Sequence, residues 1–530
     1  GEDLERLLAV TAEDVMRVYE TYVKDRPWIA VSVVPRGGED LALEGSQRAS
    51  VVEEAIVQGA ETELVAVTRG DAMTPSGIDR GAEPPYGQSP TLSAPDVWRT
   101  ELSNGVPVLG VVDDEVPLVQ FQLRIKGGQL LDDPGKVGVA NLLAETMTEG
   151  TASKTPQELE KAIDMLGASI NVSSGTQSFT ISGSTLSRNY GATMALVEEI
   201  LLEPRFDPDE FGLAQQRVAN SLRQRAASPV ALAGDVFTGL LYGDHMLGLP
   251  RLGSVESIDD ITLDDLRAYH AASVAPAHAS FLVAGDVSED EVVASLSGIA
   301  ERWHGEEPTL PAPPTWDPAT AGLYLVDVPN ASQSVVRIGY LALPESDPEF
   351  YPATVMNFRL GGGGFASDLT QVLREQRGYT YGIGSGFSGT DVPGPFQISS
   401  SVRSNITFEA LQTVKEIVEA HGPAFDAADL DATQSFLLRA NARAFETRGA
   451  KLGLLADMNA YGFPADYVLQ REQVVRDMTI ERIQELAERF LDPERMIWLV
   501  VGDARTQLDR LSALGLGEPT VLDRDGQPIG

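Results

Sequence analysis

Cysteine is absent from this chain of 530 residues. Disulfide bonds, thiol nucleophiles and cysteine-bound metals are therefore excluded. No apolar run approaches the ~20 residues of a transmembrane helix, so we expect no membrane span. No signal peptide is present either, but the chain begins with Gly1, and a removed export signal would leave no trace.

Positive charge is scarce: 40 Lys and Arg residues stand against 78 Asp and Glu residues, which gives a formal net charge of −38. Such a charge repels nucleic acid and anionic membrane surfaces, so neither is expected as a partner. It attracts cationic ligands such as basic peptides. Solubility, or adaptation to a salty medium, explains the same balance without any ligand, and net charge alone does not separate the two.

Histidine is rare as well, and its five copies are scattered: His245, His270, His278, His304 and His421. None pairs with another at the i, i+4 spacing that places two imidazoles on one helical face, so we interpret each as a surface or packing residue. No loop has the regular oxygen-ligand spacing of a calcium site, and the sequence predicts no metal in this chain. A serine hydrolase is equally unsupported, because no G-x-S-x-G elbow occurs.

One pattern occurs three times, beginning at Thr11, Thr262 and Thr479. In each copy, threonine and nearby acidic residues form a helix start with favourable charge in the first turn. A helix with 3.6-residue apolar spacing follows, then a turn containing proline and a strand. The predicted strands are residues 28–34, 280–284 and 497–501. Three such closures imply three domain ends of one type.

The spacing of the copies predicts the domain boundaries. Roughly 220 residues separate the second and third copies, a reasonable size for one domain. The first copy lies close to Gly1, so residues 1–35 are predicted to be the last helix and strand of a preceding domain. The chain is then expected to be the C-terminal piece of a longer precursor, or one half of a nicked one. Residues 36–95 are predicted to be an acidic linker rich in Pro and Gly, and residues 306–320 a second linker.

Two similar domains are predicted at 96–305 and 321–530. Residues 118–125 and 335–341 alternate apolar and polar side chains, as half-buried strands do. Amphipathic helices are predicted over residues 138–147, 156–166, 190–202 and 408–420. Strands interleaved with pairs of helices indicate an α+β fold. Each of the two homologous domains is expected to pack helices on one face of a largely antiparallel sheet.

Residues 138–151, GVANLLAETMTEGT, carry the frame G-x-x-H-x-x-E-H-x-x-x-x-G-T of an inverted zinc motif. The segment resembles the insulinase/pitrilysin-type zinc metallopeptidases, in which both histidines bind zinc and the intervening glutamate activates water. Here the glycines and threonine of the motif are kept, but its zinc ligands and its base are replaced. Asn141 and Glu145 stand in place of the histidines, and Ala144 stands in place of the base. Arg223 lies near the position of the family's third ligand, a glutamate. The resemblance therefore implies a degenerate site without zinc.

Further segments extend the resemblance in the family's order and spacing. They are LLYGDHMLG at 240–248, YHAASVAPAHASFLVAGDV at 269–287, VDVPNASQSVVRIGY at 326–340 and LGGGGFASDLTQVLREQRGYTY at 360–381. No single segment is strong evidence for the resemblance, but the order and spacing of the segments together are specific for this family. The resemblance covers about residues 95–510 and the N-terminal 35.

The last segment carries the residues to which the resemblance assigns chemistry. Family members are two homologous halves around a chamber, and the half without zinc supplies an arginine–tyrosine pair that Arg374 and Tyr381 match. Tyr381 would donate a hydrogen bond to the scissile carbonyl, and Arg374 would anchor the intermediate or the substrate backbone. The alternative is an ion-paired arginine at a helix end beside a core tyrosine.

Four consecutive glycines, Gly361, Gly362, Gly363 and Gly364, precede this pair. A phosphate-binding loop would need a following Lys-Ser or Lys-Thr, which is absent. By resemblance they form a flexible loop that faces the chamber and helps partner subunits to grip extended peptide. A helix-ending turn with positive φ explains them equally simply.

The resemblance implies the non-catalytic half of a two-part zinc endopeptidase, similar to the alpha-type subunits of processing peptidases. Its partner would be a zinc-bearing H-x-x-E-H half, either a separate subunit or the N-terminal part of the same precursor. Substrates would be unfolded peptides, basic ones included. We expect no cofactor in this chain and zinc in the partner. The alternative is a catalytically dead scaffold or peptide-binding subunit of a larger complex. Bacterial relatives favour a periplasmic or exported protein, with the cytoplasm as the alternative.

Overall fold

The computed structural model describes residues 2–35, 37–49, 79, 92–441 and 443–529. The chain forms two compact units, residues 1–55 and 56–530, which are considered separately. Within the described residues, no helix combines the length and the apolar character needed to cross a membrane. Of the predicted linker 36–95, only residues 37–49, 79 and 92–95 are described, and the rest of that prediction lies outside the described residues.

The small unit contains helices α1 (Glu2–Leu8) and α2 (Ala12–Tyr22). Helix α2 begins as predicted: the Thr11 hydroxyl accepts the Asp14 amide at 3.2 Å, and the Asp14 carboxylate accepts the Thr11 amide at 3.2 Å. The predicted strand 28–34 was wrong, because no strand forms there. A strand needs a neighbour to satisfy its amides and carbonyls, and no described strand pairs with this segment.

The first sheet of the large unit has six strands in the order β1-β2-β6-β3-β5-β4. Strand β6 is parallel to β2 and antiparallel to β3, and the other neighbours are antiparallel. The predicted strands 118–125 and 280–284 are confirmed as β3 and β6. The bounds are β1 Trp98–Glu101, β2 Pro107–Val112, β3 Leu118–Lys126, β4 Ser169–Ser174, β5 Ser178–Leu186 and β6 Ala279–Gly285.

The second sheet repeats this plan in the order β12-β7-β11-β8-β10-β9. Strand β11 takes the place of β6, since it is parallel to β7 and antiparallel to β8. Two mostly antiparallel sheets with helices confirm the predicted α+β class. The bounds are β7 Gly322–Asp327, β8 Gln333–Leu341, β9 Thr380–Phe387, β10 Pro395–Arg403, β11 Ile497–Gly502 and β12 Thr520–Leu522.

Helices cover one face of each sheet and bury a separate core there. In the first domain Phe121 and Ile125 of β3 are fully buried in this core, and in the second Trp498 of β11 is. The first-domain helices are α3 Val139–Met147, α4 Pro156–Met165, α5 Tyr190–Leu202, α6 Pro208–Ala226, α7 Pro229–Tyr242, α8 Val255–Asp260, α9 Leu263–Ser273, α10 Glu289–Ser295 and α11 Ser297–Arg302. The second-domain helices are α12 Phe350–Asn357, α13 Thr407–Ala424, α14 Ala427–Asn441, α15 Arg448–Tyr461, α16 Tyr467–Asp477, α17 Ile480–Phe490 and α18 Ala504–Leu511.

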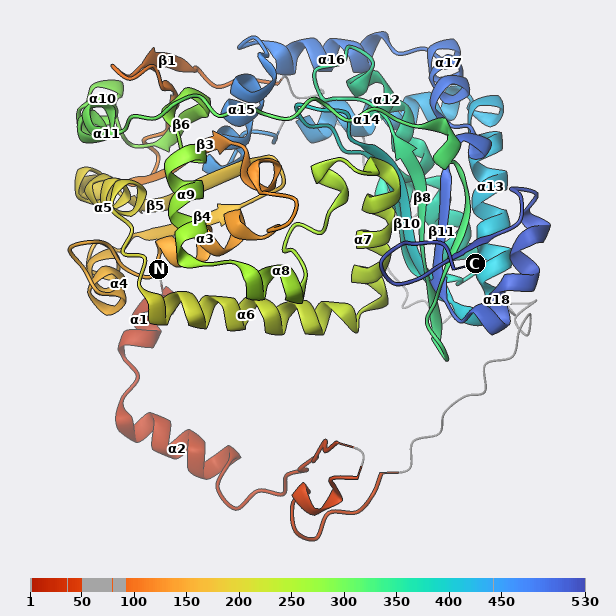
Figure 1. The fold of residues 1–530 in the computed structure, drawn as a ribbon, viewed down its shortest axis with the longest axis horizontal. Helices are drawn as coiled ribbons and strands as arrows, with labels where there is room; N and C mark the ends of the chain where they lie inside the picture. Colours follow the sequence, from red (N-terminus) through yellow and green to blue (C-terminus); the bar gives the residue numbers. More distant parts are fainter. Residues whose placement is uncertain (1, 36, 50–78, 80–91, 442, 530) are drawn as a thin grey trace. The chain divides into compact units, whose positions relative to one another are not determined.

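The opposite face of each sheet is covered by a helix from the other domain (Figure 1). Helix α7 packs against β8 and β11, and its Phe237 is buried with Val335 and Val501 of those strands. In return α15 packs against β6, where Leu455 is buried with Leu282. This exchange is the reason why both sheets belong to one compact unit.

A buried carboxylate adds a polar link between the two domains. Asp113 follows β2 and accepts hydrogen bonds from Arg448 at 3.1 Å and Lys451 at 2.7 Å, both at the start of α15. Burial opposes the charge on Asp113, but Lys451 and Arg448 outweigh it and lower the pKa of this carboxyl. The interface therefore contains a satisfied ionic group beside its apolar cores.

Candidate functional site

The motif helix α3 begins at a sharply turned glycine. Gly138 has φ +109°, and a side chain there would meet Ile258 and the Leu252 carbonyl. The Asp132 carboxylate accepts the backbone amides of Gly138 at 2.8 Å and Ala140 at 2.9 Å, which caps the helix. Burial nevertheless raises the pKa of Asp132 to about 6. The local frame of a zinc-motif helix is thus fully built.

The side chains on this frame do not form a metal site. Ala144, which stands in the place of the catalytic base, is buried in the apolar core. Asn141 and Glu145 lie one turn apart and are joined by a hydrogen bond of 3.2 Å from the amide to the carboxylate. Burial raises the pKa of Glu145, and the nearby Arg217 offsets this only in part.

Two arginines that the sequence analysis did not single out lie against these residues. Arg217 of α6 lies 3.7 Å from the Glu145 carboxylate and 3.1 Å from the Glu149 carboxylate. Arg251 donates to the Asn141 side-chain oxygen at 3.2 Å and to the Ser174 carbonyl at 2.7 Å. Guanidinium groups cannot bind a cation, since they carry only donors and stay charged. The residues present therefore do not fit zinc.

Arg223 was predicted to lie near the position of the third ligand. It occupies the exposed end of α6 and donates to the Asn220 side chain of the same helix at 2.9 Å. The side chain of α6 that reaches Glu145 is Arg217, six residues earlier. No group of three or more His, Cys, Asp or Glu side chains is gathered for metal binding anywhere in the described residues.

After α12 comes a short π-helical segment, Phe358–Gly362, whose last two residues are the first two glycines, and the other two glycines follow it. The backbone at Gly361 lies so close to Ser385 of β9 that only glycine fits, because a side chain there would collide with Ser385. Gly364 has φ +58° and open space around it. Arg359 fixes the segment by ion pairs to Asp368 at 2.9 Å and Asp429 at 2.8 Å. Only the last glycine thus forms an open turn, and the first packs tightly on the sheet.

Tyr381 lies on β9, the outer strand of the second sheet, and its side chain is 90% exposed. A β-bulge turns it outward. Thr380 pairs with Val402 and Ile383 pairs with Ser400, so an extra residue is inserted at Tyr381 and Gly382. The Thr380 hydroxyl accepts the Gly382 amide at 3.1 Å and lies 2.8 Å from the Ser401 carbonyl. Tyr381 is therefore not the core aromatic of the structural alternative.

Arg374 lies beside this tyrosine, on a second π-helical segment, Thr370–Gln376. Its guanidinium carbon is 5.2 Å from the centre of the Tyr381 ring and 4.5 Å from that of Phe365. These distances are typical of cation–π contacts. Its Nε is 3.4 Å from the Glu375 carboxylate, so a helix-end ion pair is present as well. The structure thus brings Arg374 and Tyr381 together on an exposed surface.

The histidines lie apart from both groups. Four of them place Nε2 near a backbone carbonyl: His245 at 3.0 Å from Ala312, His270 at 2.8 Å from Leu201, His278 at 2.8 Å from Pro308 and His421 at 3.2 Å from Met356. His304 is exposed. Each of the four has a structural partner that explains its position.

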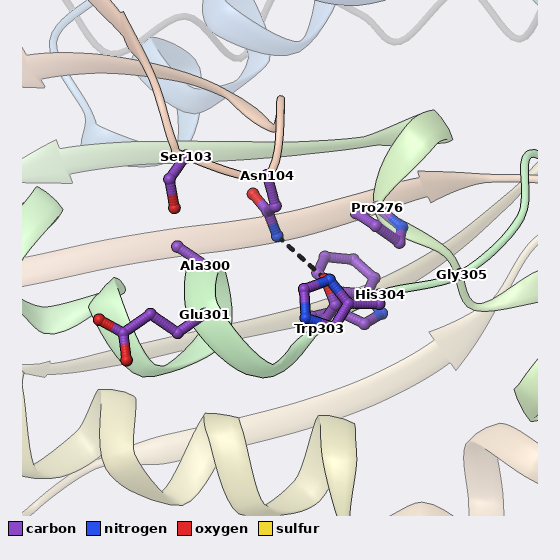
Figure 2. Close-up of a pocket in the computed structure, with 8 residues that line it drawn as sticks. All are labelled: Ser103, Asn104, Pro276, Ala300, Glu301, Trp303, His304 and Gly305. Atoms are coloured by element: carbon purple, nitrogen blue, oxygen red, sulfur yellow. Dashed lines mark hydrogen bonds between the residues drawn. The ribbon is translucent and has the colours of Figure 1, made fainter.

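A surface hollow of about 450 Å³ lies at the turn between β1 and β2 and the segment after α11 (Figure 2). Asn104 donates to the Trp303 carbonyl there at 3.4 Å. The Glu301 carboxylate points away from the His304 ring, so the two do not act as a ligand pair. None of the residues that the sequence assigns to a site lines this hollow.

Two family models and several curated proteins match the sequence of this chain. Residues 110–253 match the insulinase family (peptidase family M16), and residues 260–437 match the peptidase M16 inactive domain. An uncharacterized zinc protease of Mycobacterium leprae is 25% identical over 327 residues, 61% of this chain and 73% of that protein. A non-peptidase homolog of Helicobacter pylori is 23% identical over 424 residues, 78% of this chain and 96% of that protein.

Solved structures share the fold. A peptidase M16 inactive domain from Pseudomonas fluorescens has a TM-score of 0.72 and 24% identity, and covers 77% of this chain and 98% of its own. A protease from Helicobacter pylori has a TM-score of 0.70 and 21% identity, and covers 77% and 99%. The two family matches together span more than half of the sequence. The chain therefore belongs to the M16 insulinase family.

Proposed function

We propose that this chain is the non-catalytic half of a two-part zinc endopeptidase. It closes a peptide-degrading chamber and donates Arg374 and Tyr381 to the zinc site of its partner. The partner carries the H-x-x-E-H motif, the zinc and the general base. The observation that supports this most directly is the exposure of Tyr381, which is 90% accessible although the preceding residue of the strand, Thr380, is buried.

A tyrosine hydroxyl and a guanidinium suit the chemistry of peptide hydrolysis. Attack of water on the scissile carbonyl builds negative charge on its oxygen, which a phenolic donor and a fixed cation stabilise. The cation–π contact at 5.2 Å holds Arg374 beside the tyrosine ring. In this role Tyr381 touches the reacting carbonyl and Arg374 anchors the substrate or the intermediate.

The degenerate site supports the division of labour. Ala144 supplies no base, and the guanidinium groups of Arg217 and Arg251 lie where a metal would have to be held. A net charge of −38 favours cationic substrates, so unfolded basic peptides fit the chamber best. Extended peptides would add to an exposed sheet edge such as β9 through backbone hydrogen bonds.

The test measures hydrolysis of a fluorogenic basic peptide by this chain, by an H-x-x-E-H polypeptide of the M16 family from the same organism, and by their mixture. We expect activity only on mixing. Tyr381→Phe should lower kcat/KM of the mixture about a hundredfold, the scale of one oxyanion donor. Tyr379→Phe, which removes a hydroxyl two residues away, is the matched control and should leave kcat unchanged.

Full activity with Tyr381→Phe would overturn the catalytic role. A stable but inactive complex would instead favour a scaffold or peptide-binding subunit, which agrees with the relative described as a non-peptidase homolog. Zinc retained by the isolated chain, measured by atomic emission after dialysis, would contradict the division of labour.

A further inference from the structure

A polar cavity of about 170 Å³ lies where the two domains of the large unit meet. Strands β3, β5 and β6 of the first domain contribute to its lining, together with the end of α15 and the turn between β9 and β10 of the second. The volume is several times the ~30 Å³ share of one water molecule, so there is room for a group of several heavy atoms. The charged and polar lining includes Arg124, Lys126, His278, Ser280, Asp391 and Asn459.

The alternation of side chains along β3 directs Arg124 to this cavity. Leu123 and Ile125 point into the helical core of the first domain, so Arg124 between them points to the opposite face of the sheet. The ladder places Ser280 of β6 directly opposite Arg124. Residues paired in this way have side chains on the same face within reach of one another. A half-buried cation and a buried hydroxyl therefore share one side of the cavity.

Three hydrogen-bond donors of the lining have no partner among the described residues. They are the guanidinium of Arg124, the hydroxyl of Ser280 and the side-chain amide of Asn459. Ser280 is only 2% exposed, and the other two side chains are half-buried. Polar groups in such positions are normally hydrogen-bonded. Three donors that line one cavity would all be satisfied by a single acceptor with several oxygens.

The other charged groups around the cavity do not neutralise Arg124. Lys126 is ion-paired with Asp391 at 2.5 Å, so these two charges cancel. Asp457 of α15 interacts with Arg124 through its charge, but it forms no ion pair with the guanidinium and does not line the cavity. His278 places Nε2 at 2.8 Å from a backbone carbonyl and therefore donates there. Among the described residues of the lining, the positive charge of Arg124 is thus left without a counter-charge.

We infer that this cavity binds an oxyanion, with two of its oxygens on the Arg124 guanidinium and hydrogen bonds from Ser280 and Asn459. The planar fork of a guanidinium matches the paired oxygens of a carboxylate or a phosphate. The carboxyl terminus of a peptide and free inorganic phosphate share this chemistry. The binding does not depend on peptidase activity. It requires only the large unit, because every lining residue belongs to that unit.

Titration calorimetry with the full chain tests the site. The probes are inorganic phosphate, an N-acetylated tetrapeptide with a free carboxyl terminus, and the same peptide as its uncharged C-terminal amide. We expect one-to-one binding of phosphate or of the peptide acid, and none of the amide. Arg124→Gln should weaken that binding at least tenfold, because a charged hydrogen-bond donor is lost. The control Arg188→Gln removes the same charge from an exposed position after β5 and should leave Kd unchanged. Tighter binding of the peptide acid identifies a peptide terminus as the source of the oxyanion, and tighter binding of phosphate identifies a free anion.

Chemical protection locates the bound probe in the unaltered chain, so this measurement does not depend on how a variant folds. Saturating probe should slow the modification of Arg124 by phenylglyoxal at least fivefold, read by mass spectrometry, and leave Arg188 unaffected. Arg124→Lys keeps the charge without the fork and should bind with an affinity between those of the unaltered chain and Arg124→Gln. Absence of binding by both oxyanion probes, equal binding by Arg124→Gln, or unprotected Arg124 would overturn the inference. Tyr381→Phe should leave these affinities unchanged, so a failure of the proposed function is distinguished from a failure of this site.

Discussion

The exposure of Tyr381 depends on the hydroxyl of its neighbour Thr380. That hydroxyl lies in the β-bulge, within hydrogen-bond distance of the Gly382 amide, the Ser400 hydroxyl and the Ser401 carbonyl. It therefore replaces the ladder bonds that the extra residue disrupts. Under the proposed function Thr380 would be a positioning residue, since it would act on substrate only through Tyr381.

Replacing Thr380 by valine keeps the shape of the side chain and removes these bonds. We expect a loss of about 1–3 kcal/mol in the free energy of unfolding, because buried polar partners are left unsatisfied. In the mixture of this chain with the H-x-x-E-H polypeptide, kcat should fall about tenfold to a hundredfold because Tyr381 is misplaced. Thr380→Ser keeps the hydroxyl and should restore both quantities, which urea titration and peptide hydrolysis measure.

A second residue-scale prediction concerns His421 of α13, which is buried beside Phe425. Burial lowers its pKa to about 4, and the hydrogen bond to the Met356 carbonyl opposes this only in part. The nearby charges are Asp368, Asp429 and Arg359. The unfolded chain binds a proton near pH 6.5, so between about pH 6.5 and 4 it holds more protons than the folded chain.

Stability is therefore expected to fall as the pH drops from 7 to 4, by up to a few kcal/mol from this residue. His421→Gln should flatten that pH dependence, which is measured as the urea midpoint at pH 7 and pH 5. The exposed His304→Gln is the control and should leave it unchanged. An equal pH dependence in His421→Gln would contradict the assignment.

The degenerate site shows what single residues in a sequence can and cannot predict. The absence of the family's zinc ligands and base was predicted from the residue types at Asn141, Ala144 and Glu145. Arg217 and Arg251 were missed, since they come from an adjacent helix and a distant loop and match no motif. A contact between residues more than 70 positions apart leaves no local signal in one sequence.

At the scale of elements, the spacing of apolar residues predicted the bounds of several helices and strands well. Helix α5 has the predicted bounds, and β3, β6, β8 and β11 lie within one or two residues of theirs. The strand predicted at residues 28–34 does not form. An apolar pattern indicates only a preference for the strand conformation, and a strand also needs neighbours to pair with. The exchange of α7 and α15 was not predicted, since apolar spacing marks a face without naming what covers it.

The exchange leads to a prediction for Phe237, which α7 buries against the second sheet. Phe237→Ala should cost about 3–5 kcal/mol. Because the contact joins the two domains, the loss should lower the urea midpoint of the whole large unit. Val230→Ala on the same helix is the control, since Val230 is 50% exposed, and it should cost less than about 1 kcal/mol. Separate transitions for the two domains in the unaltered chain would argue against this coupling.

At the scale of the whole molecule, Asp113 makes the sharpest prediction. Asp113→Asn leaves Arg448 and Lys451 partly buried without their counter-charge, so we expect a loss of about 3–5 kcal/mol. The neighbouring Asp114 is exposed, and Asp114→Asn should change little. The lowered pKa of Asp113 means that this stabilisation is complete above about pH 4 and is lost only as the pH falls further. Urea titration at pH 7 and pH 3 checks both statements.

The exchanged helices also determine what a break in the chain would do. The connector at 306–320 is the covalent bridge between the domains, and its carbonyls at Pro308 and Ala312 are held by His278 and His245. A single cut there would leave two fragments, each of which buries a helix on the sheet of the other. They would migrate together under native conditions and separate only on denaturation. A gene divided at this point would encode an obligate pair of polypeptides with the same architecture.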